Sequence, residues 1–341
     1  MACSISAGFL ETNDQMCYKF SHSRRGIAVI IVNNRTGNEN IRQGSEKDTT
    51  FLQQIFNHYG FEIRTFCNMK SKELLSGLLR ISREDHSEND CFAMAISTHG
   101  MESYGCGTNG TREDVIETQD ELIPVRFLLK LFTDDKCPSL QGKPRLVFIQ
   151  ACRGQELDNG LTITCTSPKA DLEAAGDALM DAVLLKERLN PGQDDTDAPP
   201  HSHDTDGPNS NRLYDAEESI SASDTTDGKK SLSDIYIAPA PCYEHFLVMY
   251  ATPPGYFAFR NKADGSWFIR ILADVLLRSD GRQSLTRELT RVIRRVAHDM
   301  QSYNTNPRYD AKKQSPVIYS KLIKEIYLTP KNGELPRDST S

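Results

Sequence analysis

A thiol and an imidazole stand in this sequence in contexts where they could act together as a nucleophile and a base. Cys152 is the central residue of a Gln-Ala-Cys-Arg-Gly segment, and His99 lies 53 residues earlier in a Ser-Thr-His-Gly segment. Cysteine attacks as its thiolate, and a neighbouring imidazole accepts the thiol proton and returns a proton to the leaving group. The pair therefore indicates covalent catalysis at a carbonyl carbon, as in the cleavage of a peptide bond.

Glycines accompany both candidate residues. Gly100 follows His99, and Gly154 lies two residues after Cys152. The negative oxygen of a tetrahedral intermediate is stabilised by main-chain N–H groups that approach it closely, and glycine permits that approach. We expect the amides of Gly100 and Cys152 to be these donors. Taken singly, each motif has a structural explanation: a cysteine after a strand usually packs in a core, and a histidine beside glycine usually belongs to a turn.

Alternating strands and helices must hold these residues in place. Apolar runs rich in β-branched residues alternate with segments of helical periodicity, which predicts a parallel sheet covered on both faces. His99 and Cys152 follow the carboxyl ends of two such strands, the edge at which sheets of this kind bind ligands. We predict strands over 26–32, 61–66, 91–96, 145–149, 246–251, 317–319 and 325–328, and helices over 45–59 (opened by a capping signal at 45–48), 72–81, 122–132, 265–278 and 284–300.

An acidic, turn-rich segment separates two folded blocks. Residues 155–234 carry 18 acidic and 6 basic side chains, a net charge of −12 in a chain whose total is −7. Pro-Gly, Pro-Pro and Gly-Pro pairs from residue 191 onward predict a flexible linker. Either block alone would hold an unfinished sheet, so we expect them to share one. Residues 171–189 could form an amphipathic helix. We therefore divide the chain into four parts. A short mobile N-terminal prodomain at 1–20 precedes a large catalytic subunit at 21–190, whose ordered core extends to about 160. A disordered inter-subunit linker at 191–234 then leads to a small subunit at 235–341.

Composition argues against several other classes of protein. The net charge of −7 and the lack of a clustered basic face argue against a nucleic-acid-binding protein. No apolar run reaches the ~18 residues of a membrane span and no secretory signal is visible, so we expect a cytoplasmic protein. Nine cysteines, an odd number without C-x-x-C spacing, predict neither a disulfide framework nor a zinc site. We expect no metal and no cofactor.

Five further segments accompany the two reactive motifs. A histidine about 50 residues before Gln-Ala-Cys-Arg-Gly is a known signature of the caspases. With the further segments, the chain resembles a caspase of the executioner type over nearly all of residues 20–330. The resemblance implies a three-layer α/β/α sandwich around a central, mostly parallel six-stranded sheet shared by a large and a small subunit. The segments are Asp85-His86-Ser87, Gly107-Thr108-Asn109-Gly110, Gly142-Lys143-Pro144, Gly265-Ser266-Trp267-Phe268 and Ala311-Lys312-Lys313-Gln314.

The resemblance also implies an activity and a binding site. Caspases are cysteine endopeptidases that cleave after aspartate, and executioners act in apoptosis and are made as zymogens. A substrate carboxylate needs charge-assisted partners, for which arginine is suited. The resemblance assigns this pocket to Arg42, Gln150 and Arg260, and Arg260 would also anchor the substrate backbone. The subsites farther from the scissile bond would be lined by Phe257, Phe259, Asn261 and Trp267.

The chain departs from the family pattern just before Arg260. Executioner caspases usually have Tyr-Ser-Trp-Arg-Asn where this chain has Phe-Ala-Phe-Arg-Asn at residues 257–261. The Tyr-to-Phe change removes a hydroxyl, and the Trp-to-Phe change shortens an aromatic wall. We therefore expect a pocket of different shape for the residue before the aspartate.

By the same resemblance, cleavage within the acidic segment would activate the enzyme. Asp227 fits best, because Asp224 lies three residues before it and a glycine follows it; Asp206 and Asp197 are alternatives, and Asp14 could release the N-terminal arm. The partners would be protein substrates with exposed Asp-containing loops, an upstream initiator caspase and inhibitor-of-apoptosis proteins. The apolar run 316–319 would join two large/small pairs into a homodimer. We expect no nucleic-acid and no membrane partner.

Three other interpretations compete with this one. A non-enzymatic homologue, acting as a scaffold or decoy, would typically have lost the cysteine or the histidine, whereas His99 and Cys152 are both present. A related peptidase with basic or asparagine specificity would not pair its substrate with Arg42 and Arg260. An initiator caspase would carry a long N-terminal domain, and only about 20 residues precede the first predicted strand.

Overall fold

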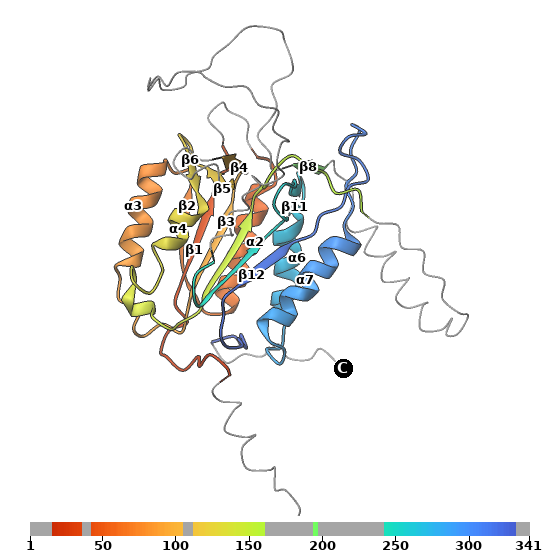
Figure 1. Ribbon diagram of the computed structural model, residues 1–341. Helices are drawn as coiled ribbons and strands as arrows, with labels where there is room; N and C mark the ends of the chain where they lie inside the picture. Colours follow the sequence, from red (N-terminus) through yellow and green to blue (C-terminus); the bar gives the residue numbers. More distant parts are fainter. Residues whose placement is uncertain (1–15, 36–41, 105–111, 161–193, 197–241, 332–341) are drawn as a thin grey trace, which may run out of the picture.

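The structure, a computed structural model, describes residues 16–35, 42–104, 112–160, 194–196 and 242–331. A six-stranded sheet in the order β12-β9-β7-β3-β1-β2 forms its centre (Figure 1). All neighbouring strands in this sheet are parallel except β12 and β9. The strands are β1 (Ile27–Val32), β2 (Glu62–Cys67), β3 (Phe92–Ser97), β7 (Arg145–Gln150), β9 (Phe246–Tyr250) and β12 (Val317–Ser320).

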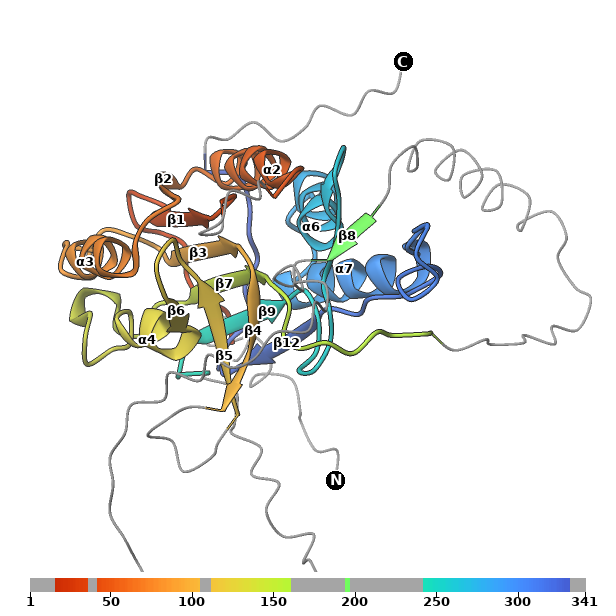
Figure 2. The ribbon, with the colours of Figure 1, turned by 90° about the horizontal axis from the view of Figure 1, so that it is seen from above.

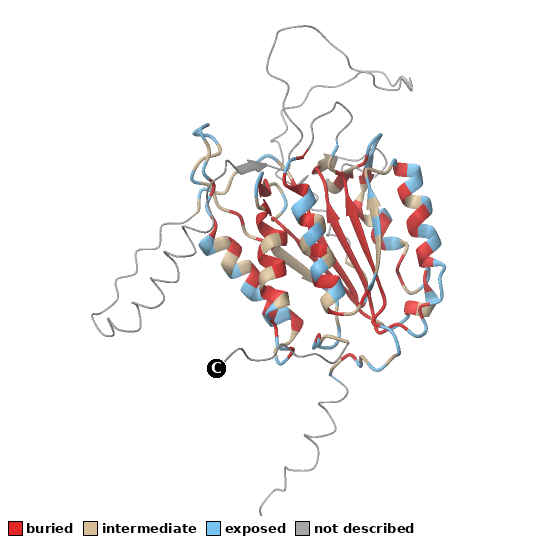
Figure 3. Ribbon diagram, turned by 180° about the vertical axis from the view of Figure 1, so that it is seen from behind, coloured by how far each residue is buried: buried red, intermediate tan, exposed pale blue. Residues whose placement is uncertain are grey.

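Continuous apolar sequence explains the inner strands. β1, β3, β7 and β9 are buried at every position, because elements on both sides of a parallel sheet cover both faces of its strands. β2 lies at an edge and has no buried residue, only exposed and half-buried ones. Figure 3 shows that the strands are buried, whereas the helices expose their outer faces.

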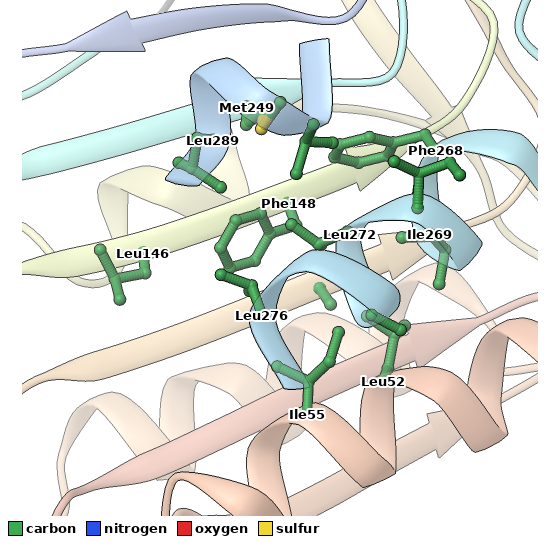
Figure 4. Packing of buried hydrophobic residues seen from close by; sticks show 14 of the residues in the cluster. Leu52, Ile55, Leu146, Phe148, Met249, Phe268, Ile269, Leu272, Leu276 and Leu289 are labelled. Atoms are coloured by element: carbon green, nitrogen blue, oxygen red, sulfur yellow. The ribbon is translucent and has the colours of Figure 1, made fainter. Parts of the chain in front are cut away.

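Helices cover both faces of the sheet (Figure 2). On one face α2 (Ser45–His58), α6 (Trp267–Leu277) and α7 (Leu285–Asp299) pack through Leu52, Leu272 and Leu289 onto Phe148 and Met249 (Figure 4). On the other face α3 (Ser71–Ser82) and α4 (Val125–Lys130) enclose a second apolar cluster, next to a 3₁₀ helix at Pro138–Leu140. The predicted three-layer α/β/α sandwich is confirmed.

The central sheet joins the two blocks of sequence. β9 comes after the acidic segment, yet it pairs in parallel with β7, which comes before it, from Arg145 opposite Phe246 to Ile149 opposite Tyr250. β12 then adds to the outer side of β9. The prediction that both blocks share one sheet is therefore confirmed.

Two small antiparallel sheets complete the described structure. One consists of β4 (Gly100–Tyr104), β5 (Arg112–Glu117) and β6 (Leu122–Pro124). The other consists of β8 (Asp194–Thr196), β10 (Phe259–Asn261) and β11 (Gly265–Ser266). β8 lies within the segment predicted to be a disordered linker, so that prediction is wrong for these three residues. Strand addition uses main-chain groups, and it does not require the apolar residues whose absence suggested disorder.

Three local predictions are wrong. Residues 325–328 form no strand: Ile326 and Leu328 are buried in the core, which explains the alternating pattern, but Glu325 makes only an isolated bridge to Cys17. The helix predicted from residue 122 begins at Val125, because Pro124 favours an extended residue before it. The helix at 45–58 has no side-chain cap; its N-cap is Gly44, with a φ of 87°.

The predicted N-terminal arm is ordered in its last described residues. Tyr18 is buried, and its hydroxyl lies 2.8 Å from Nδ1 of His245. The main-chain N–H of Tyr18 donates to the carbonyl of Glu325. Residues 16–20 therefore belong to the folded body.

The amphipathic helix predicted at 171–189 lies outside the described residues.

Candidate active site

Strand register places His99 and Cys152 at equivalent positions. Ser97 at the end of β3 pairs with Gln150 at the end of β7, and each candidate residue follows two positions later. The N–H of Thr98 donates to the carbonyl of Gln150 at 3.1 Å, which keeps the two chains together beyond the sheet. Both side chains are buried, with 5% of His99 and 2% of Cys152 exposed.

Gly100 brings the two chain segments into direct contact. A Cβ atom at this position would lie 2.8 Å from the carbonyl oxygen of Cys152 and 2.8 Å from Cβ of Ala151. Any larger residue would therefore push the His99 segment away from the Cys152 segment. The main chains of Gly100 and Cys152 are therefore in close contact, and the oxyanion hole formed by their amides stays a prediction.

The end of β5 fixes the main chain around His99. The carbonyl of His99 accepts a hydrogen bond of 2.9 Å from the N–H of Glu117. The carbonyl of Glu117 in turn accepts from the Thr98 hydroxyl at 2.8 Å and from the Asn33 side-chain amide at 2.6 Å. Hydrogen bonds to Glu117 therefore fix both Thr98 and the main chain of His99.

Cys152 contacts the chain that leads into β10. The N–H of Ala258 lies 3.2 Å from Sγ of Cys152, and the carbonyl oxygen of Ala258 lies 3.7 Å from the same atom. Two further main-chain bonds hold this junction: the N–H of Arg153 donates to Tyr256, and the N–H of Gly255 donates to Arg153. The nucleophile candidate and the strand of Arg260 are therefore neighbours.

The loop that carries Arg42 packs against the same strand. Nε of Arg260 donates to the carbonyl of Gln43 at 2.8 Å. A Cβ atom on Gly44 would lie 2.5 Å from the carbonyl oxygen of Asn261, so the two segments touch through their main chains. Arg42, Arg260 and Gln150 are all buried. The structure thus brings the three predicted pocket residues into elements that converge beside Cys152.

Aromatic residues predicted to line the neighbouring subsites make two separate ring contacts. The Phe259 and Trp267 rings stack with centroids 4.9 Å apart and planes inclined by 22°. The Phe257 ring meets Tyr309 edge to face, at 6.0 Å. Gln314, within one of the segments noted in the sequence, accepts from the N–H of Phe259 at 2.6 Å and donates to the carbonyl of Ala251 at 2.9 Å. That glutamine orients β10.

Asp48 is a supporting residue that the sequence did not reveal. Its carboxylate accepts from the Ser97 hydroxyl at 2.7 Å and from the Ser266 N–H at 2.8 Å, so it ties β3 and β11 to α2. Burial raises the pKa of Asp48, although these hydrogen bonds and the charge of Arg42 act in the opposite direction. Its place in a presumed capping signal gave no sign of this role, because Ser266 is distant in the sequence.

A second supporting contact involves the residue after the nucleophile. Arg153 forms two hydrogen bonds to Asp114 on β5, Nε to Oδ1 at 3.0 Å and Nη2 to Oδ2 at 2.8 Å. Its guanidinium also lies over the Tyr250 ring, 3.9 Å from the centroid. The pKa of Arg153 is raised, since the hydrogen bonds and charge of Asp114 outweigh burial, so the group stays cationic. The pair connects the Cys152 segment to the small sheet of His99.

Within the described ranges the structure shows no metal-binding cluster, no disulfide and no membrane-spanning helix. Among these residues no three His, Cys, Asp or Glu side chains are grouped so as to hold a metal ion. The six cysteines described there are free. In the same part of the chain, no helix has the length and apolar character to cross a membrane. The predicted processing residues Asp14, Asp197, Asp206 and Asp227 lie outside the described residues.

Comparison with known proteins agrees with this geometry. A family model described as "Caspase domain" matches residues 25–327. Caspase-3 of Bos taurus is 31% identical over 314 residues, covering 91% of this chain and 86% of that protein. Caspase-7 of Gallus gallus is 30% identical, covering 91% and 79%. The crystal structure of Caspase-1 from Spodoptera frugiperda superposes with a TM-score of 0.65 at 25% identity, covering 94% of this chain and 96% of the other. The chain belongs to the caspase family and is a cysteine-type peptidase.

Proposed function

We propose that this peptidase cleaves proteins after aspartate residues and acts as an executioner of apoptosis. The observation that supports this specificity most is that two buried arginines, Arg42 and Arg260, lie on segments that touch each other beside the chain that contacts Cys152. A guanidinium pairs with a carboxylate through two parallel hydrogen bonds, and it would repel a basic side chain. Gln150 adds a neutral polar partner in the same pocket.

Catalysis would proceed in two steps at this site. The Cys152 thiolate attacks the carbonyl carbon of the substrate aspartate, and the amides of Gly100 and Cys152 stabilise the negative oxygen. The C–N bond then breaks, and the amine leaves with a proton from His99. A water molecule, deprotonated by His99, hydrolyses the remaining thioester and regenerates the thiol. These steps require no cofactor.

Residues around the pocket would select the rest of the substrate. Phe257, Phe259 and Trp267, all buried in this structure, would line the subsites farther from the scissile bond together with Asn261 at the end of β10. The Phe-Ala-Phe sequence at 257–259 leaves more room than the family's usual aromatic set. We therefore propose tolerance for a bulky residue before the aspartate.

The working form is proposed to be a homodimer of large/small pairs. β12 pairs with β9 on one side only, and no other strand in the described part of the chain covers its outer edge. An open strand edge of apolar sequence favours pairing with a second copy around a two-fold axis. β12 would then extend the sheet of one protomer into that of its partner.

The enzyme would be activated by cleavage within the acidic segment. Cleavage after Asp227 by an upstream initiator caspase would separate the large and small chains, with Asp206 and Asp197 as further sites and Asp14 as the site that releases the N-terminal arm. The substrates would be cytoplasmic proteins with exposed Asp-containing loops, and inhibitor-of-apoptosis proteins are candidate regulators.

Peptide reporters that differ only in their last residue test this function. Processed protein is expected to release the reporter after Asp and to leave the Asn, Glu and Lys versions uncut, while the Cys152→Ala variant cuts none. Cleavage after Asn or Lys would indicate a related peptidase of different specificity. No cleavage of any reporter by processed protein would favour the scaffold or decoy interpretation.

A further inference from the structure

A surface hollow lies between α6 and α7 and shares no residue with the candidate active site. The two helices lie side by side on one face of the central sheet (Figures 1 and 2). The hollow has a volume of about 430 Å³. Seven of its eight lining residues are charged, and four of these are arginines: Arg278, Arg291, Arg294 and Arg295. So many guanidinium groups in one concave place are suited to an anionic partner, because each can bind an oxyanion through two hydrogen bonds.

Carboxylates within the hollow hold three of the four arginines in place. Nη2 of Arg278 lies 2.7 Å from Oδ1 of Asp274, and Arg295 pairs with the same carboxylate. Nη1 of Arg291 lies 2.9 Å from Oε2 of Glu288. Each guanidinium has five N–H donors, so a paired arginine keeps donors that its carboxylate does not use. These side chains are therefore ordered before a ligand arrives, which lowers the entropy cost of binding it.

Two arginines of α7 carry charge that no carboxylate offsets. Among the described residues, Arg287 and Arg294 make no ion pair and no side-chain hydrogen bond, and both are exposed. Together with Arg291 they lie on one side of α7, since residues four and seven positions apart share a helix face. Residues 278–298 carry six arginines and two acidic residues, a net charge of +4 in a chain whose total is −7. A row of positive charge therefore runs along α7 and into the hollow.

The spacing of this row matches an extended peptide. Arg287 and Arg294 are about 10 Å apart along the helix axis, because each residue of an α-helix rises about 1.5 Å. In an extended chain, side chains on the same side repeat about every 7 Å. Two or three acidic residues at alternate positions of a peptide therefore cover the length of the row, with Arg291 between its ends.

The surroundings of the row favour a peptide over a nucleic acid or a lipid bilayer. Single-stranded nucleic acids stack on exposed aromatic side chains. The aromatic residues of α6, Trp267 and Phe268, are buried, and α7 has none. Neither of these two described helices exposes a large apolar side chain that would enter a bilayer. The carboxylates of the hollow would repel a continuous row of phosphates, whereas they can accept the main-chain N–H groups of a peptide.

We propose that α7 and the hollow beside it bind an extended acidic segment of a partner protein, with carboxylates of that segment on Arg287, Arg291 and Arg294. This site goes beyond the proposed peptidase function. It holds a partner by its acidic segment, whether or not the partner contains a bond that Cys152 can cut. The affinity falls as the ionic strength rises, because the contacts are ion pairs at the surface.

Binding of an acidic peptide to the uncut chain tests this surface. The protein is the full chain with Cys152→Ala, and the probe is a fluorescent peptide of alternating glutamate and serine residues. Arg287→Glu/Arg294→Glu reverses two exposed charges without breaking an ion pair between described residues, and it should weaken binding at least about tenfold. Arg80→Glu/Arg83→Glu is the matched control, because it reverses two exposed arginines at the end of α3, on the opposite face of the sheet. The control should bind the peptide within about twofold of the parent.

Thermal unfolding and reporter cleavage separate lost binding from lost structure. Processed enzyme with Arg287→Glu/Arg294→Glu should keep its unfolding temperature and should cut the Asp reporter within about twofold of the parent. Arg287→Gln/Arg294→Gln removes the charges without reversing them and should weaken peptide binding in the same direction. No binding by the parent, equal affinity in the parent and both α7 variants, or an equal loss in the α3 control would overturn the proposal. Tighter binding of an RNA oligonucleotide of equal charge, or of anionic lipid vesicles, would also overturn it.

Discussion

At the scale of single residues, His99 and Cys152 are expected to act as one unit. Because each needs the other to move the proton, Cys152→Ala should abolish peptide cleavage and His99→Ala should cost nearly as much. Cys152 is buried and small, so its replacement by alanine should leave the unfolding temperature close to that of the parent. Reporter cleavage and thermal unfolding of both variants measure this. Activity within about tenfold of the parent in either variant would show that the roles are wrongly assigned.

Arg42 and Arg260 are expected to contribute separately to aspartate recognition. Truncation of either arginine leaves the substrate carboxylate with one cationic partner instead of two in a buried site. Arg42→Ala and Arg260→Ala should therefore each lose at least ~2 kcal/mol of transition-state stabilisation. This loss corresponds to a decrease of about thirtyfold in kcat/KM. Arg282, whose side chain is 85% exposed, supplies the control, and Arg282→Ala should cut the Asp reporter normally. Normal kcat/KM in Arg42→Ala would remove that residue from the pocket.

At the scale of secondary-structure elements, Asp48 joins α2, β3 and β11. Asp48→Ala would leave the hydroxyl of Ser97 and the amide of Ser266 without their acceptor in a buried site, at a cost of about 2 kcal/mol or more in the free energy of unfolding. Urea unfolding of this variant measures the cost. A loss of less than about 0.5 kcal/mol would mean that water or a neighbouring group replaces the carboxylate.

The titration of Asp48 gives this junction a pH dependence of definite sign. The folded protein holds the proton of Asp48 more tightly than the unfolded chain, because its pKa is raised above the ordinary value of 3.8. The contribution of Asp48 to stability is therefore full below that value and declines as the pH rises through the folded pKa. The Asp48→Asn variant lacks this decline. Its unfolding temperature relative to the parent should rise with pH across the same range, and a constant difference would contradict the shift.

How far the elements could be predicted depends on whether their signal is local. The buried strands, such as β1 and β7, carry continuous apolar runs, and the ends of β3 and β7 locate His99 and Cys152 without knowledge of the fold. Asp48 acts on Ser266, 218 positions away, and no local periodicity encodes such a contact. β8 pairs through its main chain, so its polar side chains gave no indication of a strand.

At the scale of the whole molecule, the open edge of β12 predicts a homodimer of large/small pairs. Sedimentation of processed enzyme should show an active species with twice the mass of one large/small pair. A charge on this edge, as in Val317→Lys, should shift the enzyme toward the single pair and lower its activity, because like charges face each other across a two-fold axis. Ile323→Lys is the matched control, since Ile323 is 58% exposed and lies outside β12. A fully active single pair would refute the dimer.

The pairing of β7 with β9 has a consequence for refolding after denaturation. These adjacent strands of the core are joined in sequence through the acidic segment, so cutting that segment leaves their hydrogen bonds in place while turning one polymer into two. An uncut chain can re-form this part of its core as a unimolecular event, whereas the two cut pieces must first meet in solution. After removal of denaturant, the yield of native processed enzyme should therefore fall steeply on dilution, well beyond any fall seen for uncut Cys152→Ala chain. Cleavage would thus make unfolding irreversible as well: a mature molecule that unfolds in a dilute compartment would not regain its native structure.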